Sequence, residues 1–367
     1  MRTRSCANRN VDSIKVDDAS LGTRVNHWLR LSDEMVLFVL RLLPKKDLVT
    51  VSMINKKFRD LSRDVSLWTE LTLNHQNIKQ NPNSCRKLLE RCKKLTSIKI
   101  TNSIHESLNI MTVVIRSVKS LTSLDVFDSC QKWTPAALTK LGQMKQLTSL
   151  EMSLDARFGY QGLQELGKLS QLEKITLRVA LANEDSRKVL ANVFKQLKNL
   201  KAVNVYPGNN QMVVALAKNN PNLKVLRIRL HYQATISEES IQVLGDSCPE
   251  LEALSTSIKI RSLKKLASSC RKLKSLDIEW FGKKIVSDMT LMRFLDFKSL
   301  ESLRLRLCTK VTDQGVESLV NSAESLKYLR LYHAPGVTRG LVRRLREEYP
   351  QIDVRIGSPA ARGLVEA

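Results

Sequence analysis

Hydrophobic and polar residues alternate in a short phrase that recurs along most of the chain. The phrase begins with leucine and has apolar residues three and usually five places later, as in LTSIKI at Leu95. Its leading leucines recur every 22 to 28 residues, at Leu95, Leu121, Leu147, Leu172, Leu200, Leu223, Leu251, Leu273, Leu300 and Leu326. Each phrase predicts a strand, and the regular period predicts a solenoid of stacked repeats, with irregular geometry at the short spacings that end at Leu223 and Leu273.

The sequence between successive phrases predicts helices. Thr134 can cap a helix whose first residue is Pro135, and Ser237 can cap a helix that buries Ile241. Each repeat therefore runs from strand to turn to helix and back. Repeats of this kind place their strands parallel in one sheet. The predicted fold class is α/β, with a curved solenoid whose parallel sheet forms the concave face and whose helices form the convex face.

Residues 27–73 show a helical pattern instead, and we expect a short all-helical unit there. Ser32 can cap a first helix, which Pro44 ends. Its apolar face consists of Leu31, Met35, Val36, Val39, Leu40 and Leu43. A second helix is predicted from near Lys46, and its apolar positions are Leu48, Val51, Ile54, Phe58 and Leu61. A strand-like run with Trp68, Leu71 and Leu73 follows. So small a unit buries little surface alone, which indicates a face for a partner or for the following domain.

The same segment resembles the F-box. The matching residues are Leu31, Glu34, Leu43, Pro44, Asp47, Leu48, Val51, Phe58, Arg59, Leu67 and Trp68. Ser32 stands where proline is usual, and Asn55 stands where many members have cysteine. The resemblance implies docking to the SKP-type adaptor of a cullin-RING ubiquitin ligase, and through it to cullin and RING subunits. The expected adaptor-binding residues are Trp28, Leu31, Ser32, Glu34, Met35, Val39, Leu43, Pro44 and Leu48. The alternative is an ordinary helical cap on the solenoid.

One repeat, LRLRLCTKVTDQGVESLV from Leu303, resembles the cysteine-containing leucine-rich repeat, a subclass that is common in F-box proteins. We therefore expect a flexible lead-in over residues 1–26, an F-box over 27–73, a leucine-rich-repeat solenoid with a C-terminal cap over 74–356, and a loose tail over 357–367. The cap is predicted as a last helix followed by a degenerate strand.

Composition narrows the choice of partners. The 367 residues carry a net charge of +24, which favours acidic or phosphorylated partners and permits attraction to nucleic acids or anionic membranes. Aromatic residues make up only 5%, and no glycine-bracketed aromatic block is found, so a nucleic-acid partner is the minority interpretation. The lysine-rich helices, such as RSLKKLASSCRKLK from Arg261, are interpreted mainly as a solvated convex face.

Cysteine placement and the lack of long apolar runs predict a cytoplasmic or nuclear protein with no membrane span. Cys92, Cys248 and Cys270 each lie three residues before a leading leucine, as expected for small buried side chains with reduced thiols. The N-terminus has no apolar core of the kind found in signal peptides. The five histidines lack paired metal-ligand spacing, and neither a Walker-type glycine loop nor HExxH occurs, so we expect no catalytic site, metal or cofactor.

The strand alternation predicts where a target binds. Residues two, four and six places after each leading leucine face away from the core. Arginine and tyrosine, which dominate recognition energetics, collect at these positions. The expected substrate-binding residues are Arg178, Tyr206, Arg227, Arg229, Arg304, Arg306, Tyr328, Arg330 and Tyr332. The alternative is a solvated wall on which some arginines pair with Asp277 and Glu279.

Together these features predict a non-catalytic substrate receptor of an SCF-type ubiquitin ligase that holds an acidic or phosphorylated target on the concave face. The rival hypothesis is a leucine-rich-repeat scaffold without a ligase role, or a nucleic-acid-associated binding protein.

Overall fold

The computed structural model describes residues 30–74, 80–101, 114, 118–131, 133–155, 160–230, 234–280 and 285–357. The chain divides into two compact units, an N-terminal unit, Met1–Leu67, and a C-terminal unit, Trp68–Ala367. The predicted lead-in over residues 1–26 lies outside the described residues, as does the predicted tail from residue 358 onward.

The N-terminal unit is helical, as predicted, but its second predicted helix is divided in two. Its elements are α2 (Asp33–Arg41), α3 (Lys45–Val51), α4 (Lys56–Leu61) and the short 3-10 helix η1 (Val65–Leu67). Ser32 caps α2 by accepting a hydrogen bond from the Met35 N–H. The single helix predicted from Lys46 to Leu61 is wrong, because Asn55 is extended and its Oδ1 accepts from the Phe58 N–H at 2.9 Å, which starts a new helix.

The strand-like run at the end of the predicted F-box unit belongs to the sheet of the C-terminal unit. Residues Glu70–Asn74 form β1, which pairs in parallel with β2 (Ser97–Thr101), so that Leu71 lies opposite Ile98. The helical part of the N-terminal unit therefore ends at Leu67, and Leu71 packs in the core of the C-terminal unit.

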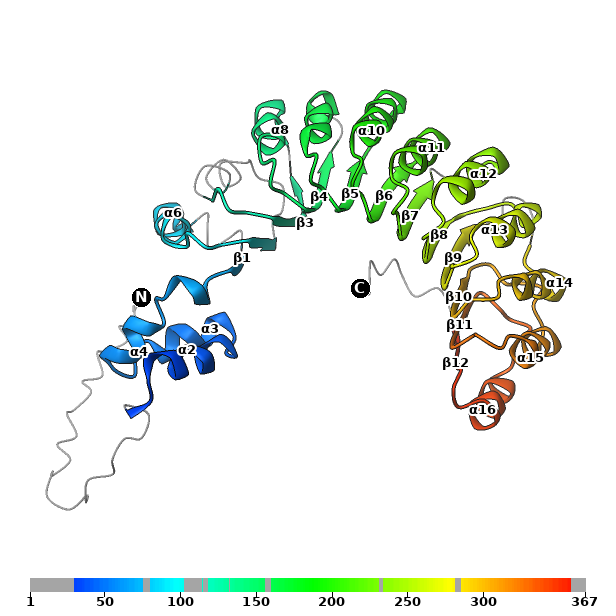
Figure 1. The fold of residues 1–367 in the computed structure, drawn as a ribbon. Coiled ribbons are helices and arrows are strands. Elements are labelled where there is room, and N and C mark those ends of the chain that lie inside the picture. Colours follow the sequence, from blue (N-terminus) through cyan, green and yellow to red (C-terminus); the bar gives the residue numbers. More distant parts are fainter. Residues whose placement is uncertain are drawn as a thin grey trace, which may run out of the picture. The chain divides into compact units, whose positions relative to one another are not determined.

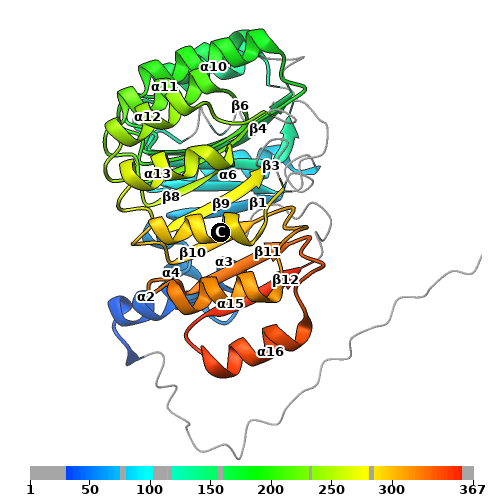
Figure 2. The same cartoon turned by 90° about the vertical axis from the view of Figure 1, so that its right-hand side faces the viewer.

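The C-terminal unit confirms the predicted α/β solenoid. Among its described residues, twelve parallel strands form one sheet in chain order. The remaining strands are β3 (Ser123–Gln131), β4 (Ser149–Asp155), β5 (Lys174–Ala180), β6 (Ala202–Gly208), β7 (Val225–Leu230), β8 (Ala253–Ser257), β9 (Ser275–Trp280), β10 (Ser302–Leu305), β11 (Tyr328–Tyr332) and β12 (Asp353–Gly357). Figures 1 and 2 show this sheet curving through the unit, with its helices along the outer face.

The outer layer contains both α-helices and shorter 3-10 segments. Its elements are α6 (Pro82–Arg91), α8 (Pro135–Gly142), η2 (Tyr160–Lys168), α10 (Glu184–Gln196), α11 (Asn210–Asn219), α12 (Glu238–Ser247), η3 (Ile260–Ser262), α13 (Leu263–Ser269), α14 (Asp288–Met292), η4 (Arg293–Asp296), α15 (Asp313–Ser322) and α16 (Arg339–Glu348). Thr134 and Ser237 cap α8 and α12 as predicted. No helix among the described residues is long and apolar enough to cross a membrane.

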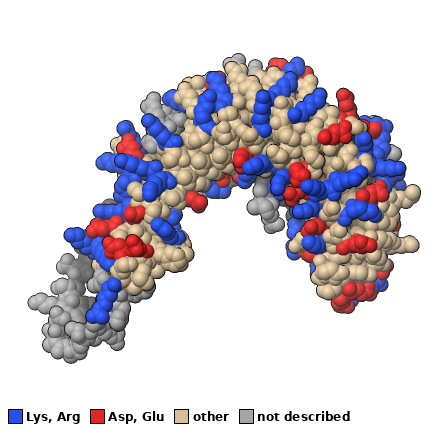
Figure 3. All heavy atoms as spheres, in the orientation of Figure 1, with Lys and Arg blue, Asp and Glu red and all other residues tan. Residues whose placement is uncertain are grey.

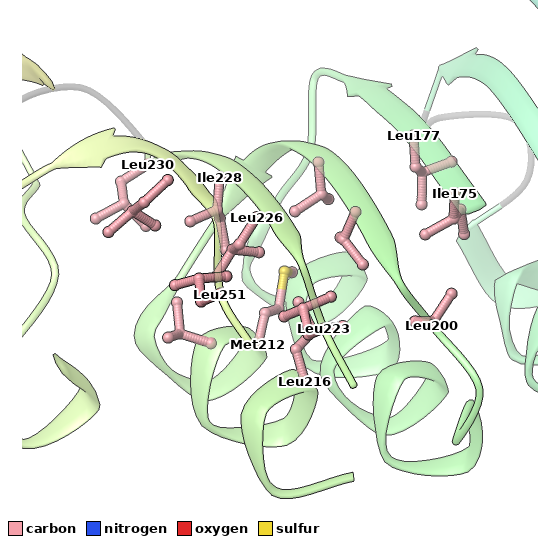
Figure 4. Packing of buried hydrophobic residues seen from close by; sticks show 14 of the residues in the cluster. Ile175, Leu177, Leu200, Met212, Leu216, Leu223, Leu226, Ile228, Leu230 and Leu251 are labelled. Carbon is pink, nitrogen blue, oxygen red and sulfur yellow. The ribbon is translucent and has the colours of Figure 1, made fainter. Parts of the chain in front are cut away.

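The core lies between the sheet and the helices, and the leading leucines fill it. All ten are buried. Figure 4 shows Leu226 and Ile228 of β7 pointing toward Met212 and Leu216 of α11, which confirms the predicted inward positions three and five places after Leu223. Strand register shifts between β6 and β7 and between β8 and β9, the two short spacings where irregular geometry was expected. It also shifts between β3 and β4, where the leading leucines are an ordinary 26 residues apart.

The repeat cysteines are buried, as their positions predicted. Burial raises the pKa of the Cys248 thiol to about 11 and that of Cys270 to about 12. The backbone oxygens of these two residues accept hydrogen bonds from the N–H groups of Leu251 and Leu273. Each cysteine thus fills a small space at the return from helix to strand.

Aspartate and threonine link the C-terminal repeats. Asp288 accepts from the N–H of Thr312 at 2.9 Å and from its hydroxyl at 2.7 Å. Asp313 accepts in the same way from Thr338, at 2.7 Å for both bonds. Gly315 is required beside the first pair, because a Cβ there would lie 2.0 Å from Asp288 Oδ1. The cysteine-containing repeat therefore uses its aspartate and glycine to join neighbouring repeats.

Candidate functional site

Helix α2 presents an exposed apolar stripe, which is the first candidate site. Val36 and Leu40 face inward and are 1% exposed. Met35, Phe38 and Leu42 follow one another at intervals of three and four on another side of the helix, and are 56%, 63% and 72% exposed. Helix α2 is therefore apolar on two sides, and the N-terminal unit covers only one of them.

The start of α2 is held in place by α4. Lys57 Nζ donates to the Leu31 carbonyl oxygen at 2.6 Å and forms an ion pair with Asp33 Oδ1 at 3.1 Å. A shallow hollow beside this anchor is lined by Leu31, Glu34, Met35, Phe38 and Val39. The hollow and the stripe make one continuous stretch of α2 that a partner can cover.

Among its described residues, the N-terminal unit exposes more large apolar side chains than it buries. Its buried apolar residues are Val36, Leu40, Leu48, Phe58 and Leu67. Its exposed large apolar residues are Met35, Phe38, Leu42, Val49, Met53 and Ile54. An excess of this kind marks an interaction surface.

The structure separates the predicted adaptor-binding residues into exposed and buried ones. Ser32, Glu34, Met35 and Pro44 are exposed, and Leu31, Val39 and Leu43 are half-buried. Trp28 lies outside the described residues. Leu48 is fully buried and is a core residue of the unit, so its assignment to the contact face was wrong.

Sequence reasoning missed several exposed residues of this unit, above all Phe38 and Leu42. Their spacing from Met35 is the signal that could have found them. Ile54, predicted as an apolar position of a long second helix, lies in the turn between α3 and α4 and is 63% exposed.

The second candidate site is the open face of the sheet in the C-terminal unit, the face turned away from the helices (Figure 1). Strand register places the residues four positions after each leading leucine in one continuous row. We call this the central row: Thr72, Lys99, Asp125, Glu151, Thr176, Asn204, Arg227, Ser255, Asp277, Arg304, Arg330 and Arg355. Most of these residues are accessible, but Thr176 is buried despite its predicted outward position.

Arg229 forms the strongest ion pair on the open face. Its Nε donates to both carboxylate oxygens of Glu279, at 2.9 and 2.8 Å, and its guanidinium lies 5.5 Å from the centroid of the Tyr206 ring. Since β8 lies between β7 and β9, this pair spans β8, and Ser257 of β8, predicted to be exposed, is buried. Arg229 is therefore paired as the alternative interpretation expects, because Glu279 on the same face neutralises its charge.

Asp277 occupies the centre of the C-terminal half of the open face. Its Oδ2 lies 3.4 Å from Arg304 NH1. Burial raises the pKa of the Asp277 carboxyl, although Arg304 acts in the opposite direction. Arg306 stacks over the Tyr332 ring at 5.7 Å. Because Glu279 is engaged by Arg229, it does not neutralise Arg306 as the alternative interpretation supposed.

Arg355 extends the central row and was missed because the last strand lacks a leucine phrase. Arg304, Arg330 and Arg355 lie opposite one another on β10, β11 and β12. Arg355 Nε donates to Asp353 at 2.8 Å. Neighbouring strands are roughly 5 Å apart, so the backbones of these three arginines lie within about 10 Å of one another along the row.

The remaining predicted substrate residues lie on the same open face. Arg178 and Tyr206 are register partners on β5 and β6, and Tyr328 is half exposed at the start of β11. Arg227 is exposed and has no ion pair with any described residue. In the part of the chain that the structure describes, no three His, Cys, Asp or Glu side chains are placed to hold a metal ion.

We expect Asp277→Asn to stabilise the protein at neutral pH. The raised pKa means that the folded state binds this proton more tightly than the unfolded state, so stability contributed by protonated Asp277 is lost as the pH rises above its ordinary value of 3.8. Asparagine imitates the protonated form. The free energy of unfolding of the variant relative to wild type should therefore increase from about pH 4 toward neutrality, as measured by urea denaturation.

Glu301→Gln is a control in which the pH dependence of the stability change has the opposite sign. A hydrogen bond from Lys327 lowers the pKa of Glu301, so its contribution to stability is present above the ordinary value of 4.5 and lost as the pH falls. The glutamine variant should lose a little stability at neutral pH and none in acid. An equal pH trend in both variants would contradict the assignment for Asp277.

Comparisons with known proteins agree with this geometry. Residues 28–70 match the F-box domain family. Among solved structures, a chain from "Crystal structure of Rad7 and Elc1 complex in yeast" has TM-score 0.50 and 16% sequence identity, with 90% of this chain and 89% of that chain covered. At this identity the likeness supports the fold alone. Curated proteins give no match. The chain thus carries an F-box domain ahead of a solenoid of the leucine-rich-repeat type.

Proposed function

We propose that this chain is the substrate receptor of an SCF-type ubiquitin ligase, in which the F-box domain docks to a SKP-type adaptor. The observation that carries the proposal is the F-box domain at residues 28–70 with its uncovered stripe Met35, Phe38 and Leu42. An apolar stripe of this size on so small a unit needs a protein partner to cover it. The yeast structure with the same fold is itself a complex of two proteins, Rad7 and Elc1, which is consistent with such a partner.

The second role of the receptor, binding the target protein, belongs to the solenoid. It holds a target on the open face, and ubiquitin is transferred to the target by partner enzymes of the complex. A rigid receptor raises the local concentration of the target at the transferring enzyme without chemistry of its own.

The chemistry of the open face favours an acidic or phosphorylated target at β10 to β12. Arg304, Arg330 and Arg355 lie in one line across these three strands, which concentrates positive charge in a small area of the wall. Arg306 and Tyr332 add a stacked pair beside this row. Arginine forks bind carboxylates and phosphates in bidentate fashion, and an anionic target can compete for them with carboxylates of the wall itself.

The adaptor role is tested by co-expressing the full chain with a SKP-type adaptor and separating the products by size-exclusion chromatography. We expect a stable complex with one copy of each protein. If the two proteins elute separately at micromolar concentration, the receptor role is wrong and the scaffold hypothesis gains support.

Charge reversal at Arg306 and Arg330 should remove the target without affecting the adaptor. The measurement compares proteins that co-purify with wild type and with the Arg306→Glu, Arg330→Glu variant across a salt series. An acidic target should be lost from the variant, and its binding to wild type should weaken as salt rises. The matched control is Lys264→Glu with Lys298→Glu, which makes the same change in charge at exposed positions outside the open face. Unchanged capture by the arginine variant at every salt concentration would contradict a target on this wall.

A further inference from the structure

A second charged surface lies at the edge of the solenoid where the chain returns from each helix to the next strand. Three successive repeats carry the same pattern there: KKLTS at residues 93–97, KSLTS at 119–123 and KQLTS at 145–149. Lysine, threonine and serine thus occur three times at equivalent positions, and neither the F-box domain nor the open face accounts for this pattern.

Hydrogen bonds stack the three turns in register. The Ser120 hydroxyl donates to the Lys93 carbonyl oxygen at 3.2 Å, and Gln146 Nε2 donates to the Lys119 carbonyl oxygen at 2.7 Å. The side chains of Lys93, Lys119 and Lys145 are all exposed. We call the surface formed by these lysines and the adjoining threonines Thr96, Thr122 and Thr148 the lysine–threonine edge.

The threonines form a ladder beside the lysines. Each hydroxyl donates to a carbonyl oxygen of the preceding repeat: Thr96 to Thr69 at 3.1 Å, Thr122 to Thr96 at 3.2 Å and Thr148 to Thr122 at 3.1 Å. The hydroxyl hydrogens are therefore engaged, and the oxygens that remain accessible can only accept hydrogen bonds.

At the threonine position of this edge, later repeats carry charged residues that pair with one another. In later repeats glutamate replaces the threonine: Glu173 pairs with Lys201 at 2.8 Å, and Glu301 pairs with Lys327 at 2.8 Å. No described carboxylate pairs with Lys93, Lys119 or Lys145. In the view of Figure 3, Lys and Arg predominate over the first repeats of the C-terminal unit, and both charges mix over its last repeats.

We propose that the lysine–threonine edge binds an extended acidic segment of a protein. Such a segment supplies carboxylates for the lysines and backbone N–H groups for the acceptor oxygens of the threonines. A DNA phosphodiester backbone offers acceptors only, which suits the lysines but not the threonines. Neighbouring strands are roughly 5 Å apart, so the three lysines span about 10 Å, the length of about three extended residues.

Other features of the edge agree with a peptide ligand. The apolar residues next to it, Val118 and Met144, are buried, so neither is available to insert into a membrane. The edge carries no aromatic residue on which a nucleic-acid base could stack. This surface shares no residue with the adaptor stripe or with the open face, so its test does not depend on the proposed ligase function.

The test measures binding of the full chain to a fluorescent peptide of alternating Glu and Ser by anisotropy, at low and at physiological salt. Lys93→Glu, Lys119→Glu and Lys145→Glu together should weaken binding by about tenfold or more, because three attractive pairs become repulsive. The control variant carries Lys195→Glu, Lys218→Glu and Lys264→Glu, an equal change in charge at exposed positions on the helices α10, α11 and α13. It should bind within about twofold of wild type.

Two further variants distinguish specific binding at the lysine–threonine edge from nonspecific electrostatic attraction. Replacing the three edge lysines by arginine should preserve binding. Replacing Thr96, Thr122 and Thr148 by valine should weaken the peptide complex by a few fold without weakening binding of a single-stranded DNA oligonucleotide. Thermal unfolding followed by circular dichroism checks that each variant is folded.

Three outcomes would overturn the proposal. They are no binding of the peptide by wild type at low salt, equal weakening by the edge and control variants, and tighter binding of the oligonucleotide or of anionic vesicles than of the peptide. Adaptor co-purification should be unchanged in all variants, so failure of this proposal is distinguishable from failure of the ligase role.

Discussion

Replacing Phe38 and Leu42 together by aspartate should abolish co-purification of the full chain with a SKP-type adaptor. Both side chains are exposed, at 63% and 72%, so the substitution removes nothing from the core of the N-terminal unit. At a contact, the change removes two apolar anchors, each worth about 2 kcal/mol or more when central to an interface. It also buries two carboxylates without partners, which costs roughly several kcal/mol more.

The control is Met289→Asp, which places one aspartate on an exposed apolar residue of the C-terminal unit. Met289 is 81% exposed at the start of α14 and lies outside the F-box domain. This variant should co-purify with the adaptor as wild type does, and circular dichroism should show native helix content for both. Retention of the adaptor by the Phe38 and Leu42 variant at unchanged affinity would show that the adaptor uses another surface.

The adaptor surface illustrates what periodicity can and cannot resolve. Spacing of three and four identifies a helix, but α2 is apolar on two sides, and the same spacing fits both the inward pair Val36 and Leu40 and the outward stripe from Met35. Which side is covered depends on where α4 packs, and that packing depends on the break at Asn55. The helix start at Asn55 could have been predicted from the sequence, because asparagine is a favoured N-cap residue.

The solenoid was far more predictable, because each repeat imposes the same constraint. A strand covered by a helix on one face must bury every second residue, so a leucine at a fixed period sets both the strand and its inward face. The inward positions of β7 follow from Leu223 alone. Three residues that the alternation places on the open face, Ser153, Thr176 and Ser257, are buried, which no single phrase reveals.

Pairing of arginines with Asp277 and Glu279 was one of the alternatives, but the sequence could not predict which arginine pairs with which carboxylate. Arg229 and Glu279 are 50 residues apart and meet across an intervening strand. Their contact joins side chains of β7 and β9 across β8, which is a property of the assembled sheet and not of one repeat. Arg355 was missed for a different reason: β12 pairs with β11 through its backbone and therefore needs no leading leucine.

Leu303→Ala should cost about 2–5 kcal/mol of unfolding free energy, because a cavity opens in the core between neighbouring repeats. Leu303 is 1% exposed and lies between Leu276 and Leu329 on the flanking strands. In a solenoid each repeat is stabilised mainly by its neighbours. The loss should therefore appear in urea denaturation and as faster amide hydrogen exchange in β9 to β11.

The control is its neighbour in the same strand, Ser302, which the alternation places on the open face. Ser302 is half-buried, and Ser302→Ala should change the unfolding free energy by less than about 0.5 kcal/mol. The two substitutions differ by one position along β10, so together they measure the register directly. Since a slip of one residue moves every side chain to the other face, comparable losses for Leu303→Ala and Ser302→Ala would mean that the central row does not face the target. A large loss at Leu303 with none at Ser302 would place Arg304, two residues beyond Ser302, on the open face where the proposed target binds.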